Sequence, residues 1–307
     1  MIDYYKIEPE QNTFKTVSIQ TTYKCQLSCS NCYLGNMLNN DSIPDIDIDR
    51  FRDFLSRLNG RTDIRFIGAE PTMNLNLFEM IKMTRKYGHR PSLLTNGLKL
   101  RREDYTKALK ISGLNMLGIS MNGGIDDDMY KEFDNGKYAK PKTIALSNCF
   151  KYNIMPHINV IMDPTNTHVI APLIDYVVNT AAAHGRAFST VKYPVALRVK
   201  SIGQMGFYRK TYTYSLEEMI DIMSDIHKFD IRKTITNTVD GYEEKRSVLY
   251  KFETSNGPML GKLTDWSVDD DGVPDSGSSR RGILTDDYKI APFFEYYSNT
   301  QESITNV

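Results

Sequence analysis

Short apolar runs alternate with longer amphipathic segments from residue 16 to about residue 229 of this 307-residue chain. The apolar runs predict strands at 16–23, 63–70, 91–97, 115–123, 155–163 and 195–203. Apolar residues at helical spacing predict helices at 47–60, 76–88, 102–113, 142–153, 167–185 and 215–229. Pro172 predicts a break in the fifth helix, and Ser215 with Glu218 predicts a capping box at the start of the sixth.

Six strand–helix units predict an α/β fold with a parallel sheet and right-handed crossovers, either a partial barrel or a doubly wound sheet. In both architectures the chemistry lies at the C-terminal ends of the strands.

The pattern changes after residue 229. Residues 247–266 predict a hairpin around Asn256-Gly257, 267–282 form a loop rich in Gly, Ser, Pro and Asp, and 283–297 predict a strand or an extended tail. We therefore expect three regions: an N-terminal extension (1–15), a barrel (16–229) and a C-terminal extension (230–307) that caps the barrel mouth or its side.

The charge balance gives no reason to expect nucleic acid or an anionic membrane as a partner, because Lys+Arg and Asp+Glu both number 38. No apolar run approaches the roughly 20 residues of a membrane span. The polar N-terminus lacks the basic and apolar regions of a signal peptide. These observations predict a cytoplasmic protein.

Three of the four cysteines, Cys25, Cys29 and Cys32, lie within eight residues directly after the first predicted strand. A zinc site would need a fourth ligand, and Cys149 and the five histidines have no ligand spacing. A disulfide would leave one thiol over. A 4Fe–4S cluster with three thiolate ligands fits better, because its fourth iron stays open to another ligand. The alternative is three unrelated buried cysteines.

The Cys-x3-Cys-x2-Cys motif resembles that of the radical SAM superfamily. The resemblance implies a partial (β/α)6 TIM-like barrel, with a 4Fe–4S cluster on the three thiolates and S-adenosylmethionine (SAM) on the open iron. Reductive cleavage of SAM then yields a 5′-deoxyadenosyl radical that abstracts a substrate hydrogen. Asn31 departs from the aromatic residue often found before the third cysteine, and Tyr23 and Tyr33 flank the motif.

Later strand ends add to the resemblance. "GAEPT" (68–72) resembles the GGEP motif, which implies that Gly68, Ala69 and Glu70 receive the SAM ammonium. "TNG" (95–97) implies that Thr95 and Asn96 line the SAM site. Ser120, in "GISMNG", is a candidate for the SAM carboxylate or ribose, and Asn122 replaces an acid often found there. Each segment also has an ordinary reading as a turn.

The fifth and sixth predicted strands supply further candidates. Asn159 would bind ribose hydroxyls, Arg198 the SAM carboxylate, and Ile202 the adenine edge. We expect five substrate candidates: His157, Lys200, Asp265, Trp266 and Arg280. The alternatives are a structural histidine, solvated charges on an outward face, and a core tryptophan beside an acidic loop.

The absence of cysteine after Cys149 argues against additional clusters, and 15 residues before the first strand are too few for a peptide-leader domain. We therefore predict a single-cluster radical SAM enzyme acting on a nucleoside, sugar or amino-acid type of small molecule, with flavodoxin or ferredoxin as reductant. The alternatives are an activase that makes a glycyl radical on a partner protein, a peptide-modifying enzyme, and a non-catalytic iron–sulfur electron-transfer module.

Overall fold

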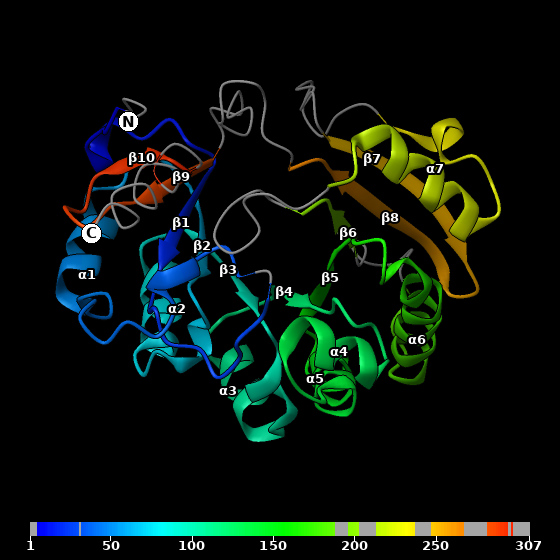
Figure 1. Ribbon diagram of the computed structural model, residues 1–307. Helices are drawn as coiled ribbons and strands as arrows, with labels where there is room; N and C mark the ends of the chain where they lie inside the picture. The colour runs from blue at the N-terminus through cyan, green and yellow to red at the C-terminus, as the bar shows by residue number, and fades with distance from the viewer. Residues whose placement is uncertain are drawn as a thin grey trace.

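The computed structural model describes residues 5–30, 32–187, 196–202, 213–236, 247–266, 281–293 and 296. Within these ranges, ten strands form one sheet in the order β10-β9-β1-β2-β3-β4-β5-β6-β8-β7. The sheet curves without closing, and the helices lie along its outer side (Figure 1).

The six predicted parallel strands are all present and pair in sequence order. They are β1 (Thr16–Gln20), β2 (Asp63–Ile67), β3 (Arg90–Thr95), β4 (Met116–Ser120), β5 (Met155–Ile161) and β6 (Ala196–Lys200). The helices are α1 (Ile48–Arg57), α2 (Leu77–Lys86), α3 (Glu103–Ile111), α4 (Asp127–Asp134), α5 (Ala139–Lys151), α6 (Ile170–Ala183) and α7 (Leu216–His227). This confirms the predicted partial TIM-like barrel.

Two local predictions were wrong. The polar segment between the strand predicted at 115–123 and the helix predicted at 142–153, where no helix was expected, contains α4, whose Asp126 side chain accepts a hydrogen bond from the N–H of Asp128 at 2.7 Å. Tyr130 and Phe133 are buried on one side of α4, which explains why so polar a segment is helical. Pro172 does not break α6, because it lies in the first turn, where the helix needs no N–H donor.

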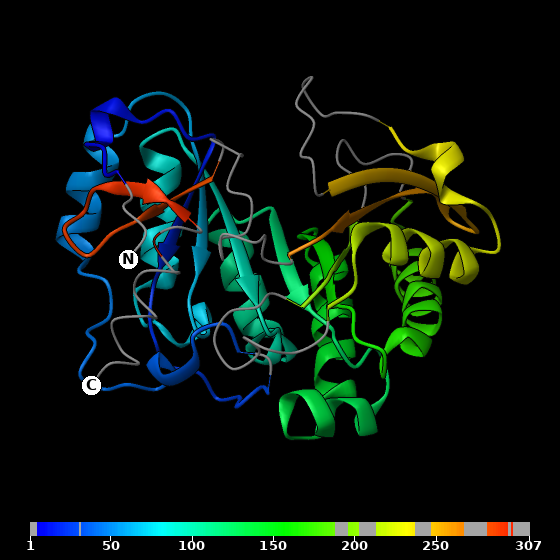
Figure 2. The ribbon, with the colours of Figure 1, turned by 45° about the horizontal axis from the view of Figure 1, so that its top comes forward.

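The C-terminal strands extend both edges of the same sheet (Figure 2). The predicted hairpin is confirmed as β7 (Ser247–Thr254) and β8 (Gly257–Thr264), and β8 pairs with β6 in parallel. At the opposite edge, β9 (Arg281–Leu284) pairs in parallel with β1, and β10 (Ile290–Pro292) completes a second antiparallel pair. The segment predicted as a strand or extended tail therefore forms two strands.

The alternation of side chains along the strands separates the core from the interior of the half-barrel. Val17 and Ile19 of β1 pack with Phe51 and Phe54 of α1 in the main hydrophobic core. The intervening residues face the concave side of the sheet, which we call the interior face. Among the described residues, no helix is long and apolar enough to cross a membrane.

Candidate active site

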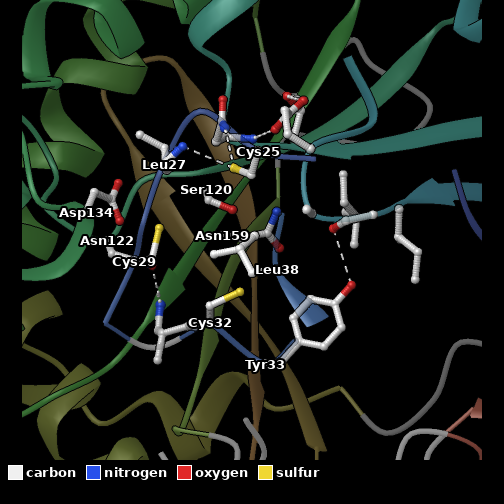
Figure 3. A pocket seen from close by; sticks show the side chains of 18 of the residues that line it. Cys25, Leu27, Cys29, Cys32, Tyr33, Leu38, Ser120, Asn122, Asp134 and Asn159 are labelled. Carbon is white, nitrogen blue, oxygen red and sulfur yellow. Dashed lines mark hydrogen bonds between the residues drawn. The ribbon is translucent and has the colours of Figure 1, made fainter. Parts of the chain in front are cut away.

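A cavity of about 230 Å³ lies at the C-terminal ends of the parallel strands (Figure 3). Twelve of the predicted site residues line it: Cys25, Cys29, Cys32, Gly68, Ala69, Glu70, Thr95, Asn96, Ser120, Asn159, Lys200 and Trp266. His157, Arg198, Ile202 and Asp265 are not among the lining residues. Arg280 and Asn31 lie outside the described residues.

The three clustered cysteines are half-buried free thiols on the loop that follows β1. The N–H of Leu27 donates to Sγ of Cys25 at 3.3 Å, and Nδ2 of Asn96 donates to the same sulfur at 3.7 Å. Burial raises the pKa of Cys25 to about 11 and also raises the pKa of Cys29 and Cys32. The thiolate form is favoured by hydrogen bonds donated to the sulfur and, separately, by a bound metal. These buried thiols therefore need such partners to lose their protons.

The three cysteines fit a 4Fe–4S cluster better than a single metal ion. No group of three His, Cys, Asp or Glu side chains in the described ranges is arranged to hold one ion. A 4Fe–4S cluster takes a single thiolate on each of three separate irons, so the sulfurs need only surround a common space. Figure 3 shows the three side chains around the cavity.

An ion pair that the sequence did not reveal lies beside Cys29. Nζ of Lys142 is 2.8 Å from Oδ2 of Asp134, and both side chains are at most 2% exposed. Lys142 also donates to the carbonyl of Ser120 at 2.9 Å and lies 4.5 Å from the ring centroid of Tyr130. Both members of the pair line the cavity. The negative charge of Asp134 adds to burial in raising the pKa of the Cys29 thiol.

The end of α4 also holds the cysteine loop in place. The N–H of Ser30 donates to the carbonyl of Phe133 at 2.9 Å, and Nδ2 of Asn135 donates to the carbonyl of Ser28. Asn135 has a positive φ of 57°, which lets the chain turn sharply there. The missed helix therefore positions the segment between the first and third cysteines.

Glu70 is fully buried and accepts four hydrogen bonds within the protein. Its Oε1 accepts from the N–H of Thr72 at 3.0 Å and from the hydroxyls of Thr72 and Thr95 at 2.7 Å each. Its Oε2 accepts from the N–H of Asn96 at 2.7 Å. The carboxylate thus joins the loop after β2 to the loop after β3.

The backbone before Glu70 approaches the cysteine loop closely. A Cβ on Gly68 would lie 2.8 Å from the carbonyl oxygen of Thr22, so only glycine fits. The N–H of Ala69 donates to that same oxygen at 3.0 Å. The hydroxyl of Tyr33 donates to the carbonyl of Gly68 at 3.3 Å, so the tyrosine after the third cysteine contacts the loop after β2.

The ends of β4 and β5 are tied together by Asn122. Its Oδ1 accepts from the N–H of Ile161 at 3.0 Å, so the amide that replaces the expected acid has a local partner. Asn159 lies next to Ser120 in the strand register and reaches into space that Gly118 leaves open. A Cβ at Gly118 would lie 2.5 Å from Nδ2 of Asn159.

The opposite wall of the cavity contains Lys200 and Trp266. Nζ of Lys200 is 4.4 Å from the centroid of the Trp266 ring, a cation–π contact. The N–H of Trp266 donates to Oγ of Ser201 at 2.6 Å, and this hydroxyl lies 3.2 Å from Oδ1 of Asp265. Ile202 is only 2% exposed.

Comparison with known proteins agrees with the fold. Residues 19–168 match the family model of the Radical SAM superfamily. The 7,8-dihydro-6-hydroxymethylpterin dimethyltransferase of Methanocaldococcus jannaschii is 30% identical over 222 residues, which are 69% of this chain and 43% of that protein. A probable GTP 3',8-cyclase of Pyrococcus abyssi is 34% identical over 116 residues, covering 37% of this chain and 36% of that protein.

Among solved structures, Streptococcus suis SuiB bound to S-adenosylmethionine aligns over 70% of this chain and 47% of that chain, with a TM-score of 0.57 and 13% identity. This likeness concerns the fold alone.

The half-barrel and its cysteine loop define a radical SAM domain. The chain belongs to the radical SAM superfamily, whose members use a 4Fe–4S cluster and SAM. It spans less than half the length of the two curated relatives described above.

Proposed function

We propose that this chain is a radical SAM enzyme with one 4Fe–4S cluster, which abstracts a hydrogen atom from a small-molecule substrate. The observation that carries the proposal is the cavity itself. It joins the three cysteines to residues from the ends of the second to sixth parallel strands, the set that a cluster and SAM together would need.

Each part of the cavity has a role in this proposal. Cys25, Cys29 and Cys32 hold the cluster, and the donors at Leu27 and Asn96 stabilise the negative charge on the Cys25 sulfur. When bound, the cluster supplies the electron that cleaves SAM. The 68–70 loop, Ser120 and Asn159 bind and orient SAM. Trp266 and Phe293 line the cavity and exclude water from the reacting groups.

The cavity of about 230 Å³ would be shared by the cluster, SAM and the substrate, and we expect the substrate to be a small molecule. Relatives and structural neighbours vary: one is named a cyclase, one a dimethyltransferase, and SuiB has been solved with its precursor peptide SuiA. A peptide substrate or a glycyl-radical partner is therefore the alternative within the enzyme class, and an electron-transfer module is the alternative outside it.

The test is SAM cleavage by the reconstituted protein. The protein is loaded anaerobically with iron and sulfide, reduced with dithionite or with flavodoxin or ferredoxin, and incubated with SAM. We expect 5′-deoxyadenosine and methionine, and an EPR signal of a reduced 4Fe–4S cluster that SAM changes. A Cys25→Ala variant should give neither product. A loaded, reducible cluster that never cleaves SAM would favour the electron-transfer module.

The reductant and the compartment remain predictions of the same proposal. Cluster thiolates persist most readily where cysteines are kept reduced, so we expect the protein to act in the cytoplasm. If 5′-deoxyadenosine forms with flavodoxin or ferredoxin at a rate comparable to the rate with dithionite, this would support one of these proteins as the reductant.

A further inference from the structure

Asp134 and Lys142 form a buried ion pair in the wall of the cavity that also holds the three cysteines. Asp134 is 2% exposed and Lys142 is 1% exposed. Removing two charges from water is costly, and a pair of apolar side chains of similar size is often as stable or more stable in such a place. Stability alone therefore does not explain why the chain places two charges beside the cysteine loop.

Three elements of the fold fix the position of both charges. The ammonium of Lys142, on α5, lies 2.8 Å from the carboxylate of Asp134, at the end of α4. It also donates to the carbonyl of Ser120, at the end of β4, at 2.9 Å. The ring of Tyr130 on α4 lies against the same ammonium, 4.5 Å from its centroid. The pair is thus held by β4, α4 and α5 together.

The cysteine loop is attached to the same end of α4. The N–H of Ser30, the residue after Cys29, donates to the carbonyl of Phe133, the residue before Asp134, at 2.9 Å. Figure 3 shows the side chains of Asp134 and Cys29 next to each other in the cavity wall. A buried carboxylate is therefore fixed beside the second cysteine.

The negative member of the pair acts on Cys29 more strongly than the positive member. Burial raises the pKa of the Cys29 thiol most, Asp134 raises it further through its charge and a hydrogen bond, and Lys142 lowers it by less. Because charge interactions weaken with distance, the pair presents its negative end to this sulfur. Cys25 has the opposite surroundings, since the N–H of Leu27 and Nδ2 of Asn96 donate to its sulfur.

A charge in this position matters for electron transfer. The reduction potential of an iron–sulfur cluster depends on nearby charge, on hydrogen bonds to its sulfurs and on exposure to solvent. Reduction adds one electron, so a fixed negative charge beside a ligand makes reduction harder and the reduced cluster a stronger donor. In the proposed function this electron comes from the external reductant and passes to SAM, whose carbon–sulfur bond breaks to give methionine and the 5′-deoxyadenosyl radical.

We propose that Asp134 and Lys142 are positioning residues that lower the reduction potential of the cluster, with the carboxylate directed at Cys29 and the ammonium fixing the carboxylate there. This inference rests on the proposed function, because it needs a cluster on the three cysteines. It adds a device in the protein that sets how strong a reductant this cluster becomes.

The test is a redox titration of the reconstituted protein, followed by the EPR signal of the reduced cluster. SAM is omitted, so that an effect on SAM binding cannot change the result. The main variant is Asp134→Asn/Lys142→Met, which removes both charges and leaves neither of them buried without its partner. We expect its equilibrium to shift about tenfold towards the reduced form, a rise of about 59 mV for a one-electron couple.

The single variants should shift the potential in opposite directions. Asp134→Asn should raise it above that of the double variant, and Lys142→Met should lower it below that of the wild type. Each single variant leaves one buried charge without its partner, so the double variant decides the test if the single variants do not fold.

The matched control is Glu103→Gln/Lys151→Met. It removes an ion pair of 2.6 Å that also involves α5, but whose side chains are about half exposed. Solvent and salt screen such charges, so the potential of this control should equal that of the wild type. A loss of general stability in either double variant would not by itself move the potential.

Four results would overturn the inference. Equal potentials of the wild type and the Asp134→Asn/Lys142→Met variant would show that the pair does not act on the cluster, and a lower potential in this variant would show that Lys142 dominates. A loss of iron in this variant alone would show that the pair holds the loop and does not set the potential. These three results leave the proposed function intact. A wild-type protein that takes up no cluster would refute the inference and the proposed function together.

Discussion

Glu70 offers the sharpest test of how the site is held together. Replacing it with Gln keeps the shape of the side chain but converts one carboxylate oxygen into an NH₂ donor. Because Oε1 accepts three hydrogen bonds and Oε2 accepts one, the amide oxygen of the variant should occupy the place of Oε1. The NH₂ group then faces the N–H of Asn96, so two donors oppose each other in a buried place.

The magnitude follows from that geometry. The variant loses one hydrogen bond to a charged acceptor, worth about 1.5–3 kcal/mol, and leaves a buried donor unpaired, which costs about 1–3 kcal/mol. Relief of the cost of burying a charge offsets part of this loss. We expect Glu70→Gln to lower the free energy of unfolding by about 3 kcal/mol.

Urea unfolding of the cluster-free protein measures the change, with circular dichroism and tyrosine fluorescence as two probes of one transition. Hydrogen exchange should become faster at the amides of Thr72 and Asn96, which Glu70 accepts from. The matched control is Glu79→Gln on α2, where the carboxylate is 60% exposed and 4.0 Å from Arg52. That change should cost less than about 0.5 kcal/mol.

A urea midpoint of Glu70→Gln equal to that of Glu79→Gln would refute this expectation. The carboxylate would then not be a structural tie between the two loops. A direct role towards the SAM ammonium, as the family resemblance implies, would be the better account, and loss of SAM affinity in a stable variant would support it.

Three further predictions concern other parts of the chain. Cys149→Ala should lose about 1 kcal/mol of stability, because Cys149 is fully buried in the core, but should keep its full iron and sulfide content after reconstitution. Cys25→Ala should lose iron. Equal iron loss in the two variants would contradict this expectation. Gly118→Ala should weaken SAM binding in calorimetry, because its Cβ would lie 2.5 Å from Nδ2 of Asn159 and must displace it; unchanged affinity would remove Asn159 from the SAM site. Burial lowers the pKa of His227 to about 4, so on acidification the unfolded chain takes up the proton before the folded chain does. The contribution of His227 to the free energy of unfolding should therefore be fully present above about pH 6.5 and decrease as the pH falls towards 4. A His227→Gln variant should show a shallower fall in urea midpoint between these pH values, and an unchanged slope would count against the histidine.

The strand–helix repeat was predictable because each helix has apolar residues at helical spacing within its own segment. In α1, Phe51, Phe54 and Leu55 recur at helical spacing and are buried against the sheet. The cysteine spacing likewise predicted three cluster ligands on one loop, since ligand spacing on a single loop is a local property. Long periodic segments and compact motifs can both be read without tertiary information.

The parts that were missed depend on contacts between distant residues. Asp134 lies in a segment for which the sequence predicted no helix, and Lys142 begins the helix predicted at 142–153, so only the folded chain shows that the two are buried as a pair. The pairing of β9 with β1 is equally invisible, because Thr16 meets Arg281 across almost the whole chain. The four donors around Glu70 were equally invisible, because they come from the loops after β2 and β3; its expected role towards the SAM ammonium stays a prediction.

The position of β9 has a consequence for how the protein is made. Until residues 281–284 leave the ribosome, β1 presents an unpaired edge, although the cysteine loop that follows it has long been synthesised. Cluster insertion into the nascent chain would therefore take place on an unfinished sheet. A chain that ends before residue 281 should expose that edge and aggregate, however complete its cysteine motif.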